Sequence, residues 1–187
     1  MSGTAGASRR PCRRRGRHLA NKSQPSRTAR PVLSFVSPGA ERLAGDHDVS
    51  KDVFISHASD DAALANRLAV FLEACGVKCF IAPRDVPAGT QWDAAIVDGI
   101  VGSAGLVLLL STAANASSYV KNEVNRAFSS HKPIFTFRLE DIAPEKSLSL
   151  YLARHQWIDG FPGPVEAKFA LLGETIAAWL ARPVAKP

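Results

Sequence analysis

Two polar residues stand at the end of an apolar segment that has the composition of a buried strand. Residues 53–56 predict this strand, Ser56 is its last residue, and His57 follows directly. In open parallel α/β sheets, ligands bind beyond the carboxyl ends of the strands, so these side chains could form hydrogen bonds with a substrate. We favour this binding role over His57 acting as a base, because a histidine without a visible partner is more often structural. The ordinary pKa of histidine keeps the base role open.

A carboxylate and an aromatic ring share one face of a predicted helix. The helix spans 118–130, and Tyr119 and Glu123 lie four residues apart on it, one turn from each other. An adjoining apolar stripe leaves both side chains near its edge; it consists of Val120, Val124 and Ala127. Spacing alone favours a surface glutamate that pairs with Arg126 or Lys121. A catalytic role for Glu123 therefore needs support from elsewhere in the chain.

The segment 82–89 contains two prolines and a glycine, which exclude regular structure and predict a loop. Within it, Arg84 could hold a phosphate group through its forked guanidinium. The alternative is an ion pair with the neighbouring Asp85, which contributes little stability at a protein surface. The sequence does not choose between these two roles.

The three tryptophans are predicted to differ in their surroundings. Trp92 begins a predicted helix and could flank a ligand pocket, but its spacing with Ile96 and Ile100 favours packing in the core. Trp157 and Trp179 are predicted to be core residues.

Short apolar segments alternate with amphipathic helices from residue 52 onward. The predicted strands are 53–56, 77–81, 106–110, 133–139 and 155–158, and the predicted helices cover 59–75, the region 92–100, 118–130 and 165–180. Ser59 is expected to be the N-cap of the first helix, with Asp60 and Asp61 favouring its dipole, and Gly76 is expected to end it. This β–α alternation predicts a five-stranded parallel sheet with right-handed crossovers.

The formal net charge of +6 on the 187-residue chain is divided unevenly. Residues 1–50 hold ten Lys and Arg against three Asp and Glu, whereas residues 51–187 hold thirteen against fourteen. We therefore predict a disordered basic extension at 1–48, a folded domain at 51–182 and a short tail at 183–187. A nearly neutral domain argues against nucleic-acid binding by the fold itself. The arginine cluster at 9–17 could touch nucleic acid or an anionic membrane, although a solvated extension is the simpler interpretation.

Cysteine use and missing motifs narrow the functional classes further. Cys12, Cys75 and Cys79 show neither a disulfide framework nor zinc-ligand spacing, which predicts a cytoplasmic protein without a metal site. No apolar run approaches the roughly 18 residues that a membrane span requires. The glycine motifs of dinucleotide-binding folds and P-loops are absent, so hydride transfer and ATP chemistry have no support.

Five stretches together resemble the Toll/interleukin-1 receptor (TIR) domain family, especially its bacterial members. They are DVFISHASDD at 52–61, APRDVPAG at 82–89 followed by Trp92, LVLLLS at 106–111, SYVKNE at 118–123 and QWID at 156–159. Each stretch alone is weak evidence for the family, but their order and spacing together make the match strong. The five stretches cover about residues 51–181. The resemblance implies a flavodoxin-like fold with strand order 2-1-3-4-5, helices on both faces of the sheet, and a site near strands one and three. The switch-point rule for parallel sheets places a ligand site there as well.

Enzymatic members of the family cleave NAD⁺ between nicotinamide and ribose, and their pattern of an aromatic residue, three residues and a glutamate resembles Tyr119 and Glu123. The aromatic residue is often tryptophan in the family, and here it is tyrosine. The resemblance makes Glu123 the catalytic residue and Ser56, His57, Arg84, Trp92 and Tyr119 the candidates for binding NAD⁺. A nearby carboxylate would stabilise the oxocarbenium-like sugar left when nicotinamide departs. NAD⁺ would be a substrate, so no cofactor is expected.

The resemblance also implies protein partners. Other TIR domains are non-catalytic adaptors that bind each other in immune signalling, which is the alternative function for this chain. The loop at 82–89 resembles the family's BB loop, which reaches a neighbouring subunit. Its expected contact residues are Arg84, Asp85, Val86, Pro87 and Gly89. The expected partners are therefore NAD⁺ together with a second copy or another TIR protein, in bacterial immunity or stress signalling.

Overall fold

The computed structural model describes residues 51–153 and 157–182, which form a parallel five-stranded sheet between two layers of helices. The strands are β1 (Lys51–Ser56), β2 (Cys79–Phe80), β3 (Ser103–Leu110), β4 (Ile134–Arg138) and β5 (Trp157–Asp159). Their order in the sheet is β2-β1-β3-β4-β5, and every adjacent pair is parallel. The predicted fold class and strand order are confirmed.

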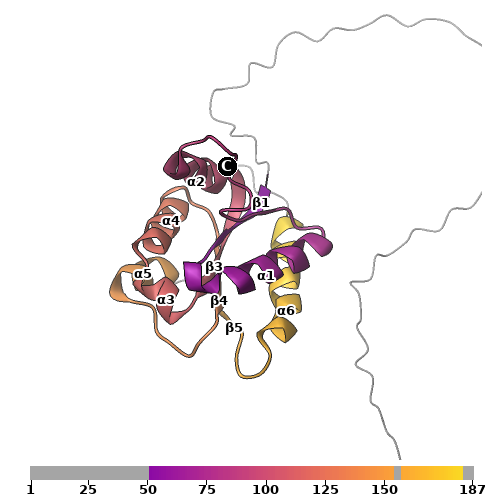
Figure 1. Cartoon of the computed structure of the whole chain (residues 1–187). Coiled ribbons are helices and arrows are strands. Elements are labelled where there is room, and N and C mark those ends of the chain that lie inside the picture. The colour runs from indigo at the N-terminus through magenta and orange to yellow at the C-terminus, as the bar shows by residue number, and fades with distance from the viewer. Residues whose placement is uncertain (1–50, 154–156, 183–187) are drawn as a thin grey trace, which may run out of the picture. The chain divides into compact units, whose positions relative to one another are not determined.

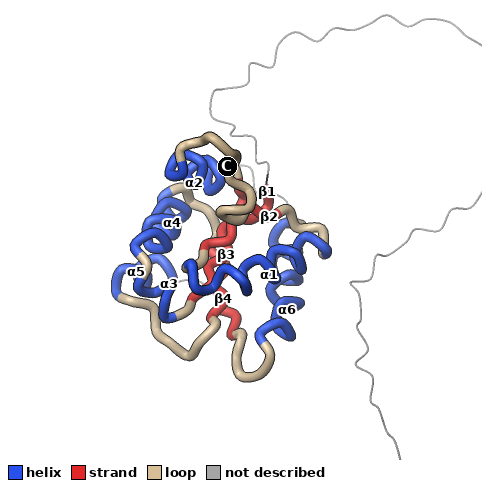
Figure 2. The backbone as a smooth tube through the Cα atoms, in the orientation of Figure 1, coloured by secondary structure: helices blue, strands red, loops and turns tan. Residues whose placement is uncertain are grey.

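The helices cover both faces of this sheet, as Figure 1 shows. They are α1 (Ala62–Ala74), α2 (Trp92–Val101), α3 (Thr112–Ala116), α4 (Ser118–Ser129), α5 (Lys146–Leu152) and α6 (Phe169–Leu180), with short 3-10 turns η1 (Ser59–Asp61) and η2 (Val165–Lys168). Helices α1 and α6 lie on one side of the strands, and α2, α4 and α5 lie on the other (Figure 2).

Two buried clusters of apolar residues hold these layers together. β1 and β3 pair along most of their length and contribute to both clusters, since successive side chains of a strand point to opposite faces. Residues Leu106–Leu110 are all fully buried, which explains why this strand is apolar without alternation. The cluster beneath α4 contains Val120, Val124 and Ala127, the predicted apolar stripe of that helix.

The first helix ends as predicted but begins differently. Gly76 adopts a positive φ of 89° directly after α1, and the amide of Val77 donates back to the carbonyl of Leu72. The prediction that Ser59 caps the helix is wrong, since a 3-10 turn occupies Ser59–Asp61 and its start has no side-chain cap. The carboxylate of Asp61 instead accepts a hydrogen bond of 2.5 Å from Ser111 at the end of β3. This tertiary contact competes with local capping.

The remaining differences concern short elements and strand ends. Helices α3 and α5 are not predicted from the sequence, because with five and seven residues they are too short to show a helical period. The strand predicted at 77–81 is reduced to Cys79–Phe80, and part of the strand predicted at 155–158 lies outside the described residues. Trp157 and Trp179 are half-buried and pack at the margins of the core rather than inside it.

Several expectations concern residues outside the described part. The predicted disordered extension at 1–48, its arginine cluster, Cys12 and the tail at 183–187 all lie there. Within the described residues, no helix is long and apolar enough to cross a membrane. Cys79 is buried, and burial raises the pKa of its thiol to about 12, which suits a small apolar core residue.

Gly160, directly after β5, provides a test of this packing. A Cβ atom there would lie 2.9 Å from the backbone carbonyl oxygen of Arg138 and 2.8 Å from a methyl group of Val165. We expect Gly160→Ala to lower the free energy of unfolding by about 1–3 kcal/mol, because a backbone atom cannot rotate away. Gly173→Ala is the matched control: its Cβ would meet Leu72 at 3.6 Å, an ordinary contact. Chemical denaturation of both variants measures the difference, and equal stabilities would contradict this packing.

Candidate functional site

The central contact of the site joins the end of β1 to the middle of α4. Ser56, the last residue of β1, is fully buried, and its hydroxyl donates a hydrogen bond of 2.5 Å to Oε2 of Glu123. Helix α4 is capped by Ser117, whose hydroxyl accepts a hydrogen bond from the amide of Val120 at the helix start. A strand end and a helix 67 positions apart in the sequence therefore meet through a carboxylate.

The surroundings of Glu123 change its acid–base behaviour. Burial raises the pKa of its carboxyl group to about 7, and the hydrogen bond from Ser56 opposes this rise. Among the described residues, Glu123 has no ion-pair partner, so the surface pairing with Lys121 or Arg126 is not formed. Lys121 pairs instead with Glu145. A poorly solvated carboxylate without a compensating cation can interact strongly with positive charge on a ligand.

His57 lies beside this contact and is held by its own backbone. Its Nδ1 atom lies 3.3 Å from the carbonyl oxygen of Ile55. Because a carbonyl oxygen only accepts, Nδ1 carries the proton in this contact and Nε2 is left as an acceptor. Burial lowers the pKa of His57, although the Ile55 hydrogen bond and nearby Asp61 act in the opposite direction. Near neutral pH the ring is therefore uncharged and suited to hydrogen bonding.

Two cavities meet at Glu123. The strand-end cavity, of about 330 Å³, lies beyond β1 and is lined by residues that include Ile55, His57, Ala58, Ala82, Pro83 and Ser117. The interhelical groove, of about 520 Å³, lies between α2 and α4 and is lined by residues that include Asp93, Ile96, Val97, Ile100, Asn122 and Arg126. Trp92, Tyr119 and Glu123 line both cavities, so the carboxylate stands where they join.

Two aromatic rings stand at this junction. Trp92 is 46% exposed and Tyr119 is 69% exposed. The preference for Trp92 as a core residue is wrong: Ile100, two turns further along α2, is buried, but Trp92, the first residue of the helix, is exposed. Large exposed aromatic rings beside a cavity are typical of a surface that another molecule covers.

The structure does not bring Arg84 to Glu123. Its guanidinium donates to both oxygens of Asp85 and of Glu73, at 2.6–3.1 Å, and it lines neither cavity at Glu123. The intraloop ion pair considered for Arg84 is therefore present, extended to α1 by Glu73. Hydrogen bonds from Asp85 and then Glu73 raise the pKa of Arg84, so it remains charged.

The loop at 82–89, which resembles a BB loop, is held in place by contacts of its own residues. The carboxylate of Asp85 accepts a hydrogen bond of 2.9 Å from the amide of Ile81, and Val86 packs against the cluster beneath α2 and α4. Pro87 and Gly89 are exposed, and Gly89 has a positive φ of 83°, which favours glycine. The loop therefore presents a defined outer surface.

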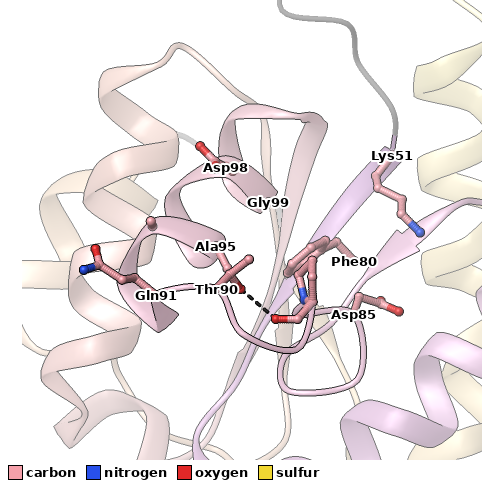
Figure 3. A pocket seen from close by; sticks show the side chains of 10 residues that line it. Lys51, Phe80, Asp85, Thr90, Gln91, Ala95, Asp98 and Gly99 are labelled. Atoms are coloured by element: carbon pink, nitrogen blue, oxygen red, sulfur yellow. Dashed lines mark hydrogen bonds between the residues drawn. The ribbon is translucent and has the colours of Figure 1, made fainter.

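A separate hollow of about 460 Å³ lies between the BB loop, β2 and α2, and it shares no lining residue with the cavities at Glu123. Figure 3 shows Phe80 and Gly99 at its wall, Lys51 and Asp98 around it, and the hydrogen bond between Thr90 and the backbone of Pro87. Because it holds no buried catalytic group, we place the candidate site at Glu123.

Sequence reasoning missed the polar wall of the interhelical groove. Asn122, Asn125 and Ser129 line it, and Arg126 was considered only as an ion-pair partner of Glu123. Spacing could have found these residues, since positions three to four apart share a helix face. Within 51–153 and 157–182, no group of histidine, cysteine or acidic residues could hold a metal ion.

Comparison with known proteins identifies the fold. A family model described as the TIR domain matches residues 53–172. The crystal structure of the TIR domain of the Toll-related receptor TRR-2 from Hydra magnipapillata has a TM-score of 0.58 and 22% identity, covering 68% of this chain and 99% of that one. A metazoan TIR-STING receptor from C. gigas has a TM-score of 0.53 and 20% identity over 76% of this chain.

The same TIR-STING receptor in complex with 2′,3′-cGAMP has a TM-score of 0.56 and 23% identity over 73% of this chain. The matched region spans only 44% and 41% of these two receptor chains, so the likeness concerns one part of them. A search of curated proteins found no match.

The raised pKa of Glu123 predicts a dependence of stability on pH. Between pH 4.5, the ordinary value, and about 7, the unfolded chain releases a proton that the folded chain retains. Wild-type stability therefore falls as pH rises through this window, and Glu123→Gln removes this loss. We expect the free energy of unfolding of the variant to exceed that of wild type by about 1–3 kcal/mol at pH 8 and by little at pH 4.5.

Urea unfolding across this pH range measures the difference. Glu174→Gln, at an exposed position of α6, is the control, and parallel curves for all three proteins would argue against a buried Glu123.

Proposed function

This chain belongs to the TIR-domain family, and from that membership we propose that it is an NAD⁺ glycohydrolase that cleaves the bond between nicotinamide and ribose in immune or stress signalling. The family includes both NAD⁺-cleaving enzymes and non-catalytic adaptors. The observation that supports an enzymatic function is the environment of Glu123. Its carboxyl group is largely buried, accepts a hydrogen bond from Ser56 and lies where two cavities meet.

The proposed reaction requires little more than a well-placed negative charge. When the bond from C1′ to the pyridinium nitrogen breaks, its electron pair stays with nicotinamide, which leaves as a neutral molecule. The ribose then carries positive charge shared between C1′ and the ring oxygen, and a nearby carboxylate stabilises it. No general acid is needed, because the leaving group was already cationic. One glutamate is therefore sufficient for this step.

A nucleophile completes the reaction. Water attacking C1′ forms ADP-ribose and releases a proton, whereas attack by the adenine of the same molecule forms a cyclic isomer. In the strand-end cavity, the free Nε2 of His57 can accept a hydrogen bond from the substrate or the water. Trp92 and Tyr119 flank the junction and provide rings against which nicotinamide packs.

The second candidate is an adaptor that acts through contacts between TIR domains. Its support is the exposed outer part of the BB loop, at Pro87 and Gly89, in a loop whose Asp85 carboxylate accepts a hydrogen bond from the amide of Ile81. Self-association is compatible with both candidates, since a neighbouring copy could cover the exposed rings of Trp92 and Tyr119.

Replacement of the carboxylate separates the two candidates. We expect Glu123→Gln and Glu123→Ala to reduce NAD⁺ cleavage about 10²–10³-fold, the usual loss when a transition-state charge partner is removed. Glu174→Gln should retain wild-type activity. Nicotinamide release from the full chain, measured by chromatography with and without a crowding agent, tests this expectation, and mass spectrometry distinguishes linear from cyclic ADP-ribose. If assembled wild-type protein leaves NAD⁺ intact, the adaptor is supported instead.

The pH dependence of the reaction tests the role of Ser56. Because the ionised form of Glu123 is required, kcat/KM for NAD⁺ should rise with pH through about 7 and then level off. The hydrogen bond from Ser56 lowers this pKa, so Ser56→Ala should move the rising limb to higher pH by up to about one unit. If Ser56→Ala lowers kcat at every pH without shifting the rising part of the pH profile, Ser56 does not act through the acidity of Glu123.

A further inference from the structure

The two cavities that meet at Glu123 differ in the chemistry of their walls. Apart from Glu123 itself, no charged side chain among the described residues lines the strand-end cavity. The interhelical groove is larger and has an apolar wall on α2 with Trp92, Ile96 and Ile100, and a polar wall on α4. A molecule with a small planar ring at one end, whose positive charge would lie beside Glu123, and an anionic, polar body at the other would match this pair of cavities.

Arg126 is the one cation that lines either cavity within the described residues. It is exposed, and in this part of the chain no carboxylate lies within ion-pair distance of it. Arg84, the cation expected to hold a phosphate, is already bound to Glu73 and Asp85. A phosphate group of a bound nucleotide would therefore find a free guanidinium at Arg126 and none at Arg84.

The position of Arg126 on α4 suits the dimensions of a dinucleotide. It follows Glu123 by three residues, so the two side chains leave the same helix face about 4.5 Å apart along the axis. Asn122 and Asn125 line the same wall and carry amide donors. Asp93, the other acidic residue that lines the groove, lies in the first turn of α2 on the facing wall. Its charge disfavours a phosphate there and leaves the α4 wall as the favourable side.

We propose that Arg126 binds the pyrophosphate of NAD⁺ in the interhelical groove, while the nicotinamide occupies the strand-end cavity and the bond between them lies beside Glu123. This inference rests on the proposed function and specifies how the same site holds its substrate. A guanidinium can donate two parallel hydrogen bonds to phosphate oxygens, which fixes the ligand along the groove as well as attracting it.

Binding of ADP-ribose to a catalytically inactive chain tests the proposal directly. In the full-length Glu123→Gln protein, adding Arg126→Ala should weaken ADP-ribose binding about 10- to 100-fold in calorimetric titrations, with Arg126→Lys intermediate. Nicotinamide riboside lacks phosphate, so its binding should not change. Arg67→Ala is the matched control, since Arg67 pairs with Glu166 and lines neither cavity. Because Arg126 is exposed, the thermal midpoint of unfolding should stay constant.

Steady-state kinetics provide the second measurement. With Glu123 intact, Arg126→Ala should raise KM for NAD⁺ at least tenfold and leave kcat within about threefold, because the pyrophosphate does not change during the reaction. A loss in kcat at constant KM, or unchanged ADP-ribose binding in Arg126→Ala, would overturn the proposal. If wild type cleaves no NAD⁺ but its ADP-ribose binding still depends on Arg126, the proposed function fails and the assignment of Arg126 stands.

Discussion

The hydrogen bond between Ser56 and Glu123 is the interaction on which the whole site depends. Ionising a carboxyl group that is largely removed from water is unfavourable, and here a single serine hydroxyl partly offsets this cost. The result is a glutamate whose pKa lies near neutrality and whose charge has no other partner in the described structure. Such a group is poised to interact with a cation that a ligand brings.

The parallel sheet makes this contact possible. β1 and β3 are adjacent and parallel, so Ser56 at the end of β1 and Ser111 directly after β3 lie at the same edge of the sheet. Ser111 holds Asp61 and the start of α3, and Ser117 begins α4 one short helix later. The apolar stripe of α4 then fixes the rotation of the helix over the sheet. Glu123, at the edge of that stripe, is turned toward the strand end.

The sequence predicted the elements that have a long apolar periodicity or a recognisable local motif. The strand ending at Ser56, the helix carrying Tyr119 and Glu123, and the order of the five strands all follow from apolar periodicity together with the family resemblance. Helices α3 and α5 are too short to show the apolar periodicity from which a helix is predicted. No local pattern revealed the 3-10 turn at Ser59–Asp61, or that the carboxylate of Asp61 would pair with Ser111, 50 positions away.

Residue types and spacing by themselves determined which side chains could act together: a carboxylate and a ring on one helix face, and polar groups at the end of a strand. Only the tertiary structure decided their environment. It buried Glu123 without a cation, engaged Arg84 with Glu73 and Asp85, and left Trp92 exposed and Arg126 unpaired within the described residues. Burial and pairing are set by neighbours far away in the sequence, because desolvation and charge interactions depend on distance in space rather than on separation along the chain.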